Sequence, residues 1–166
     1  MEMEEQFRVE LEKEQLIFSA AHFITFVDAD GNTICEQLHG HNYRVRCEVF
    51  GSLNEHGYVV DFIALRDTLA NLVKQFDHKM LVATEHPTIK VTDDQREVTL
   101  SFEDRRWVFP RVDCVLLPIS NTTAELLARQ LCDRLIESGV MDGSVTKVVV
   151  SVDENEGQWG VCAKSL

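Results

Sequence analysis

Four stretches of the chain have the hydrophobic pattern of β-strands, and in the first two of them hydrophobic and polar residues alternate with a period of two, loosely in the first. The four stretches are residues 7–18, 43–50, 147–152 and 159–163. The turn sequence Asn155-Glu156-Gly157-Gln158 separates the last two, so they are predicted to form a hairpin.

Two further stretches show the 3.6-residue period of amphipathic helices. The first covers residues 61–76, with Asp61 in the N-cap position. The second begins near Thr122, which forms a capping-box pattern with Glu125, and ends at Ser138-Gly139. The order strand, strand, helix, helix, strand, strand predicts an α+β fold with an antiparallel sheet and both helices on one face.

Residues 80–118, between the two helices, interrupt this plan. Their short apolar stretches are separated by Asp93-Asp94 and Asp104-Arg105-Arg106, which favours a small β-meander. We interpret this segment as a β-rich insertion. The chain of 166 residues has the size of one domain, so we expect residues 1–166 to form a single domain that carries the insertion.

Charge and cysteine usage limit the partners and the compartment. The chain holds 28 acidic and 16 basic residues, and the formal net charge of −12 argues against nucleic acid or an anionic membrane as partner. No apolar run is long enough to cross a bilayer, and the acidic start lacks the features of a signal peptide. Five cysteines without a C-x-x-C motif are typical of a reducing compartment, so we expect a cytoplasmic protein.

Three histidines are candidate metal ligands. His39 and His41 flank Gly40, and residues two apart on a strand face the same side. His22 follows the small residues Ser19-Ala20-Ala21 near the end of the first strand. Three imidazoles without an obvious fourth protein ligand are typical of an open, catalytic zinc site. On spacing alone, surface histidines or histidines with structural hydrogen bonds are the alternative.

Cys35 lies just before two of these histidines, in Cys35-Glu36-Gln37-Leu38-His39. A nearby divalent cation favours the thiolate, which is both nucleophilic and basic. We therefore expect Cys35 to be the reactive cysteine. A ligand role and simple burial are the alternatives.

Carboxylates supply the remaining candidates. Asp77-His78 follows the first helix and can act as a proton relay, although histidine is also favoured at a helix C-terminus by the dipole. Glu154 continues the apolar face of the strand at 147–152, where a carboxylate suits a ligand with two adjacent N–H donors. A solvated position beyond the strand end is the alternative for Glu154. For Glu125, a helix cap and a ligand contact are both open.

Six segments together resemble the 6-pyruvoyl-tetrahydropterin synthase / 6-carboxytetrahydropterin synthase family. They occur in the family's order and cover nearly the whole chain outside residues 80–118. The combination is specific, whereas no single segment is. The segments are Phe18-Ser19-Ala20-Ala21-His22, Cys35-Glu36-Gln37-Leu38-His39-Gly40-His41-Asn42-Tyr43, Gly57-Tyr58-Val59-Val60-Asp61-Phe62, Phe76-Asp77-His78-Lys79, Thr123-Ala124-Glu125 and Val150-Ser151-Val152-Asp153-Glu154.

This resemblance implies the tunnelling fold, with a four-stranded antiparallel sheet and two helices on one face. It also implies a homo-oligomer, a hexamer formed as a dimer of trimers, with active sites at subunit interfaces. In such an assembly Asp77 and His78 can complete a site in a neighbouring subunit.

The resemblance also implies a role for each candidate residue and a small-molecule pterin substrate, 7,8-dihydroneopterin triphosphate. The implied roles are Zn²⁺ binding by His22, His39 and His41, general base catalysis by Cys35, proton relay by Asp77 and His78, anchoring of the pterin ring by Glu154, and lining of the pterin pocket by Thr123 and Glu125.

The spacing within the cysteine–histidine segment resembles one branch of the family. Three residues separate Cys35 from His39, as in members that make 6-carboxytetrahydropterin on the queuosine (7-deazaguanine) route. Members that make 6-pyruvoyltetrahydropterin usually have a longer spacing. We therefore expect a zinc-dependent lyase that makes 6-carboxy-5,6,7,8-tetrahydropterin.

Three alternatives accompany this expectation. The first is 6-pyruvoyl-tetrahydropterin synthase, which eliminates triphosphate at the same residues. The second is a protein that binds zinc and a pterin without converting it. The third is a plain zinc hydrolase, which fits less well because Cys35 and Glu154 would then have no role. A further branch of the family makes a folate precursor. That branch typically carries glutamate in place of the cysteine, so Cys35 argues against it.

Overall fold

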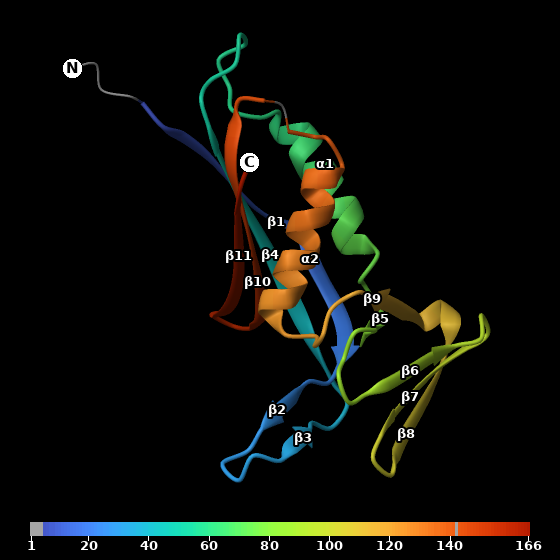
Figure 1. The fold of residues 1–166 in the computed structure, drawn as a ribbon. Coiled ribbons are helices and arrows are strands. Elements are labelled where there is room, and N and C mark those ends of the chain that lie inside the picture. The colour runs from blue at the N-terminus through green and yellow to red at the C-terminus, as the bar shows by residue number, and fades with distance from the viewer. Residues whose placement is uncertain (1–4, 142) are drawn as a thin grey trace.

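The computed structural model describes residues 5–141 and 143–166, which form one large sheet, two α-helices and two small sheets (Figure 1). The helices are α1 (Phe62–Lys74), the short 3₁₀ helix η1 (Arg111–Asp113) and α2 (Ala124–Glu137). The strands are β1 (Phe7–His22), β2 (Thr25–Val27), β3 (Thr33–Cys35), β4 (His39–Gly51), β5 (Lys79–Ala83), β6 (Lys90–Asp93), β7 (Glu97–Phe102), β8 (Arg105–Pro110), β9 (Cys114–Leu117), β10 (Val145–Asn155) and β11 (Gln158–Ser165).

The large sheet has six strands in the order β11-β10-β4-β1-β5-β9. β11, β10, β4 and β1 pair antiparallel, as expected. The expected total of four strands is wrong, because β5 and β9 continue the sheet in parallel beyond β1. Both added strands are short and rich in apolar residues, and β5 is buried from Met80 to Ala83, which suits a strand covered on both faces. Their pairing also covers backbone groups that β1 would otherwise expose at an edge.

The middle of the same segment forms the expected β-meander. β6, β7 and β8 make a three-stranded antiparallel sheet. An apolar cluster distinct from the main core joins this meander to the rest of the protein. It combines Val98, Leu100 and Phe102 of β7 with Phe23 and Met80 from the large sheet and its margin. The insertion is therefore packed onto the fold through its own core.

Both helices lie on the same side of the large sheet (Figure 1) and contribute their apolar faces to the main core. α1 begins after Asp61, whose carboxylate accepts hydrogen bonds from the amides of Ile63 and Ala64. The predicted N-cap of this helix is confirmed.

The capping box predicted for α2 is wrong. The N-cap is Thr123, whose hydroxyl accepts a hydrogen bond from the amide of Leu126. Thr122 is instead buried, and its hydroxyl donates to the carbonyl of Phe23. The segment before α2 therefore turns inward, toward the end of β1.

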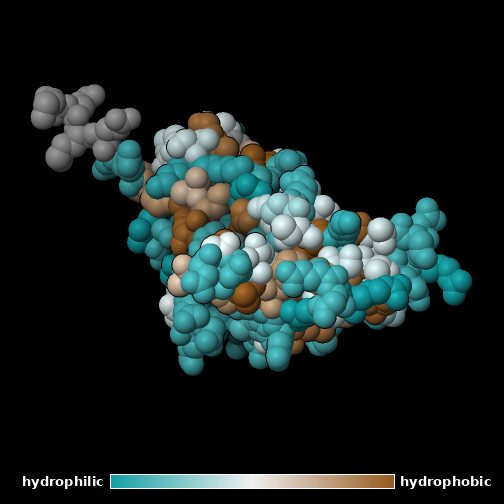
Figure 2. Space-filling model, turned by 60° about the horizontal axis from the view of Figure 1, so that its bottom comes forward, coloured by the Kyte–Doolittle hydropathy of each residue, from teal (hydrophilic) through white to brown (hydrophobic). Residues whose placement is uncertain are grey.

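Figure 2 shows the lower end of the molecule in Figure 1, where hydrophilic residues separate small apolar areas. Exposed apolar side chains include Phe26 and Val27 of β2, Ile34 of β3 and Leu38 just beyond it. Within the described ranges, no helix is long and apolar enough to cross a membrane.

The contact between β11 and the first turn of α2 depends on Gly160. A Cβ at this position would lie 2.4 Å from both the carbonyl carbon of Ala124 and the amide nitrogen of Glu125. We expect Gly160→Ala to lower the free energy of unfolding by about 1–3 kcal/mol, as overpacking against rigid neighbours does. Gly143→Ala is the matched control, because a Cβ there meets no atom within 4 Å. Urea unfolding measures both, and equal midpoints for the two variants would contradict the prediction.

Candidate active site

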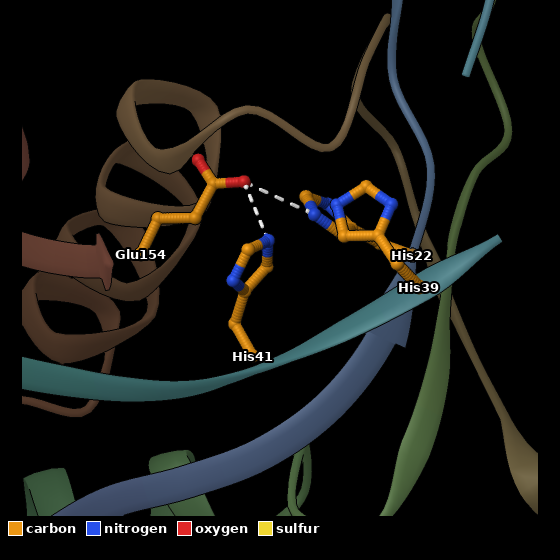
Figure 3. Close-up of side chains that lie close together, drawn as sticks. All are labelled: His22, His39, His41 and Glu154. Carbon is orange, nitrogen blue, oxygen red and sulfur yellow. Dashed lines mark ion pairs between the residues drawn. The ribbon is translucent and has the colours of Figure 1, made fainter. Parts of the chain in front are cut away.

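Three histidines from two neighbouring strands face one another (Figure 3). His22 ends β1, and the register pairs it with His39, the first residue of β4. His41 stands two residues further along β4, on the same face. The ring centroids are separated by 4.8 Å for His22 and His39, 5.2 Å for His22 and His41, and 4.8 Å for His39 and His41.

A carboxylate from a third strand completes the cluster. Glu154 of β10 places its Oε1 3.1 Å from Nε2 of His22 and 3.2 Å from Nε2 of His41. One ligand atom from each of the four residues lies within 4.8 Å of all the others. The sequence indicated three histidines without a fourth ligand, and the structure adds Glu154 beside them.

The outer nitrogens of two histidines are held by backbone carbonyls. Nδ1 of His22 lies 2.9 Å from the carbonyl oxygen of Thr122, and Nδ1 of His39 lies 2.8 Å from that of Gln37. A carbonyl only accepts, so Nδ1 carries the proton and the lone pair of Nε2 is free. The His22 side chain is fully buried, which lowers its pKa to about 4, with smaller contributions from His39 and His41. His22 is therefore neutral at physiological pH, the form that binds metals.

The cluster fits a divalent cation. Nε2 of His22 and Nε2 of His41 are buried and have no hydrogen-bond partner among the described residues, because Glu154 approaches them without the geometry of a hydrogen bond. Buried polar atoms are rarely left in this condition. Imidazole nitrogens with an outer partner on Nδ1, together with a carboxylate, are the donor set of zinc sites.

Thr122 is a site residue that the sequence assigned only to a helix cap. Its carbonyl holds His22, its hydroxyl lies 3.2 Å from the same nitrogen, and the hydroxyl also donates to Phe23. A threonine at a helix start carries no sequence signal for this role, because the contact spans 100 residues.

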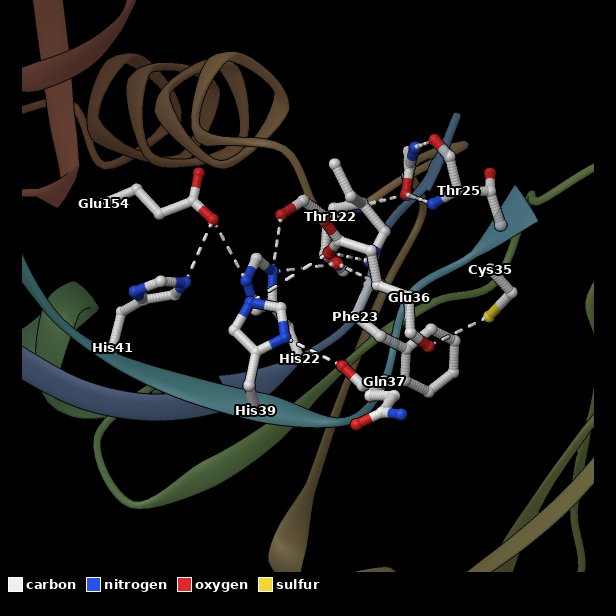
Figure 4. Close-up of polar contacts among 12 residues, drawn as sticks. His22, Phe23, Thr25, Cys35, Glu36, Gln37, His39, His41, Thr122 and Glu154 are labelled. Atoms are coloured by element: carbon white, nitrogen blue, oxygen red, sulfur yellow. Dashed lines mark hydrogen bonds and ion pairs between the residues drawn. The ribbon is translucent and has the colours of Figure 1, made fainter. Parts of the chain in front are cut away.

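The structure places Cys35 apart from the histidines. Its side chain is 9% exposed and belongs to the apolar cluster of the insertion, and its Sγ lies 3.6 Å from the carbonyl of Glu36 (Figure 4). Burial raises the pKa of the Cys35 thiol, and the charge of Arg105 partly offsets this effect.

Glu36, the next residue, lies nearer to the cluster. Its carboxylate is 4.0 Å from Nε2 of His39 and accepts a hydrogen bond from the amide of Ile24. Sequence reasoning did not single out Glu36. The available signal was its position in the short segment between a cysteine and two candidate ligands.

Asp77 and His78 form a pair beside β1. Nδ1 of His78 lies 2.9 Å from the Asp77 carboxylate, which also accepts a hydrogen bond from the amide of Ser19. The hydrogen bond from the Ser19 amide is the main reason why the pKa of Asp77 lies below its usual value. The hydrogen bond from the His78 side chain acts in the same direction. His78 has a positive φ of 57° and an 82% exposed side chain, and it borders an open pocket of about 600 Å³ together with His41.

Two further candidates lie at the start of α2. Thr123 is the helix N-cap, and Glu125 is an exposed residue of the first turn. The pKa of Glu154 is raised mainly by burial, and the negative charges of Glu36 and Glu125 contribute in the same direction. The negative charges of Glu36 and Glu125 therefore act on Glu154, which lies next to His22 and His41.

The fold and the cluster define a small α+β protein with a histidine-rich cluster, able to hold a metal ion, at the end of its central strands. A family model described as 6-pyruvoyl tetrahydropterin synthase matches residues 10–165. The chain belongs to this family.

Two relatives carry the name putative 6-carboxy-5,6,7,8-tetrahydropterin synthase. The protein from Pyrococcus abyssi is 32% identical over 121 residues, which cover 73% of this chain and 70% of the relative. The protein from Methanocaldococcus jannaschii is 29% identical over 152 residues, which cover 89% of this chain and 88% of the relative.

The crystal structure of 6-pyruvoyl tetrahydropterin synthase from Plasmodium vivax is also similar. Its TM-score is 0.88 at 27% identity, over 98% of this chain and all of that one. Another structure of the Plasmodium vivax protein is a variant in which a glutamate described as a catalytic residue is replaced by alanine.

We expect the purified protein to bind about one zinc ion per chain, and His41→Ala to weaken binding by at least about 100-fold. Loss of an outer partner alone costs about 10–100-fold in metal affinity, and a direct ligand contributes more. His56→Ala is the control, because its side chain is 64% exposed and stands outside the cluster. Competition with a chromophoric chelator measures the affinity, and unchanged binding by His41→Ala would rule out this site.

Proposed function

We propose that this protein is a zinc-dependent lyase that converts 7,8-dihydroneopterin triphosphate to 6-carboxy-5,6,7,8-tetrahydropterin. The observation that carries the proposal is the group of three imidazoles with inward-facing nitrogens next to a carboxylate. The names of the relatives from Pyrococcus abyssi and Methanocaldococcus jannaschii support the same product. The reaction cleaves a carbon–carbon bond of the side chain and releases triphosphate.

His22, His39 and His41 would hold the zinc ion. Bound there, the ion would act as a Lewis acid that stabilises negative charge developing on the side-chain oxygens of the substrate. The carbonyl of Thr122 orients the ring of His22, and the carbonyl of Gln37 orients the ring of His39. Rotation of either ring would break its hydrogen bond. This arrangement would keep the donor atoms aimed at one point.

Glu154 would anchor the pterin ring, and Thr123 and Glu125 would border it. A carboxylate accepts two parallel N–H bonds, which matches the edge of a pterin. Because Glu154 also lies next to His22 and His41, a ring bound by it would stand directly beside the metal centre. Such placement brings the reacting side chain of the substrate to the ligand cluster.

Asp77 and His78 would act as the proton relay. The carboxylate fixes the orientation of the imidazole by a contact of 2.9 Å to Nδ1. The amide of His78 donates to the carbonyl of Ser19, so both residues are tied to the same position of β1. The exposure of His78 suits a residue that completes a site formed with another copy of the chain.

We therefore propose a cytoplasmic homohexamer, a dimer of trimers, with active sites between subunits. Such an assembly would also cover apolar side chains of the β2–β3 hairpin, including Phe26 and Val27.

The general base would come from the segment that links β3 to β4. We propose Cys35 for this role. Burial raises the pKa of its thiol, and the charge of Arg105 partly offsets this effect. Glu36 is the competing candidate, because its carboxylate lies nearer to His39. The glutamate described as catalytic in the Plasmodium vivax protein is the reason to test both.

Anaerobic incubation of the zinc-loaded protein with 7,8-dihydroneopterin triphosphate tests the reaction, with products identified by mass spectrometry. We expect 6-carboxytetrahydropterin and acetaldehyde in equal amounts. A 6-pyruvoyl product would assign the sister activity to the same residues. Bound but unchanged pterin would contradict the enzyme assignment and favour a binding protein.

Replacement of the two candidate bases separates them. We expect Cys35→Ala to lower kcat by about 10²–10⁴, the usual contribution of a general base, and Glu36→Gln to have a smaller effect. Cys162→Ala is the control, since this partly exposed cysteine lies on β11. The reverse order of effects would assign the base to Glu36 and overturn the role of Cys35.

A further inference from the structure

The last residue of β3 and the three residues that link it to the histidines of β4 carry much of the proposed chemistry. This segment, residues 35–38, holds both candidate bases, and the carbonyl of Gln37 orients His39. The amide of Glu36 donates to the carbonyl of Ile24, while the amide of Ile24 donates to the carboxylate of Glu36. These local bonds attach the segment to the end of β1 at one point.

A second attachment comes from the insertion. Arg105, the first residue of β8, donates from one guanidinium nitrogen to the carbonyl of Cys35 at 2.7 Å and from the other to the carbonyl of Glu36 at 2.9 Å. The two bonds span 70 and 69 residues of sequence. The rigid fork of a guanidinium can hold two successive carbonyls at once, whereas the single ammonium of lysine cannot reproduce this geometry.

Arg105 is itself held by aromatic side chains that lead back to the metal centre. Its guanidinium carbon lies 4.6 Å from the centroid of the Trp107 ring. Trp107 stacks on Phe23 with centroids 4.6 Å apart and an interplanar angle of 24°. Phe23 follows His22, and its carbonyl accepts the hydroxyl of Thr122. Consecutive contacts therefore connect His22, through Phe23, Trp107 and Arg105, with the segment that precedes His39.

We propose that Arg105 is a positioning residue that holds residues 35–38, and with them the candidate bases and His39, in the arrangement used by the reaction proposed above. The insertion then contributes to the active site through Arg105 and Trp107, beyond its own folding. The guanidinium of Arg105 contacts the backbone carbonyls of Cys35 and Glu36 and the ring of Trp107, so it acts on the segment through its backbone.

The neighbouring residue supplies a matched control. Arg106 has the same charge and lies on the same strand, but it faces solvent, whereas Arg105 and Trp107 are partly buried. Arg105→Gln removes both the charge and the fork. Arg105→Lys keeps the charge and the apolar stem, so it provides a folded variant if Arg105→Gln is unstable.

The first readout needs no substrate. Cys35 is 9% exposed, so its alkylation requires the segment to open. We expect iodoacetamide to modify Cys35 about tenfold faster or more in Arg105→Gln, because two charged hydrogen bonds are lost, and at the wild-type rate in Arg106→Gln. Peptide mass spectrometry identifies the modified cysteine. Arg105→Lys should fall between the two.

The second readout is turnover with the pterin substrate. We expect kcat to fall at least tenfold in both Arg105 variants with little change in KM, because Arg105 positions the segment and does not bind the ligand. Wild-type alkylation and wild-type kcat in Arg105→Gln would overturn the proposal. A change in thermal midpoint alone would indicate a purely structural role and would also overturn it. If the wild-type protein shows no turnover, the proposed function fails, whereas the alkylation result still decides whether Arg105 holds the segment.

Discussion

The buried imidazole of His22 connects the parts of the protein on which the site depends. His22 ends β1 and contacts Thr122 in the segment that precedes α2. It also faces His41 on β4 and Glu154 on β10. A fully buried ring must have its polar atoms satisfied, and within residues 5–141 and 143–166 a hydrogen-bond partner is found for Nδ1 and not for Nε2. The other nitrogen is left for a ligand. The packing of the two central strands against the start of α2 therefore places an unpaired nitrogen at a point where a cation could bind.

The edge of β1 has a comparable influence on Asp77 and His78, the pair proposed as the proton relay. β5 joins this edge in parallel at Ala20 and Ala21, directly after Asp77 and His78 in sequence. The carboxylate of Asp77 and the amide of His78 both bind the backbone of Ser19, and His78 takes up a left-handed backbone conformation. Such a conformation costs free energy in a non-glycine residue and persists where its surroundings enforce it. The strand pairing thus places the pair beside β1 and presents the imidazole outward.

The insertion contributes both to the large sheet and to the surroundings of the candidate base. Its first and last strands enlarge the main sheet, and its apolar cluster includes Phe23 and Cys35 from the region of the metal centre. The burial of Cys35 in this cluster raises the pKa of its thiol, while Arg105 acts in the opposite direction. The environment of the candidate base is therefore set by residues that lie about 70 positions further along the chain.

Local sequence patterns indicated the four antiparallel strands of the large sheet, the two α-helices and the residue types of the site. Period-two alternation places His39 and His41 on one face of β4, and the strand register then brings His22 opposite them. Asp61 marks the start of α1 because its carboxylate accepts hydrogen bonds from the amides of Ile63 and Ala64, which lie two and three residues further along. These features depend on neighbours within a few residues or on the regular geometry of a strand pair.

Only the tertiary structure decided the size of the sheet, the role of Thr122, the orientation of Cys35 and the reach of Arg105. β5 and β9 resemble other short apolar stretches in sequence. They become strands of the large sheet because β5 pairs with the edge of β1 and β9 pairs with β5. Thr122 has the sequence pattern of a cap but is drawn inward by contacts with His22 and Phe23. Each of these outcomes depends on a contact between residues far apart in the chain, whose energy is not encoded in any local pattern.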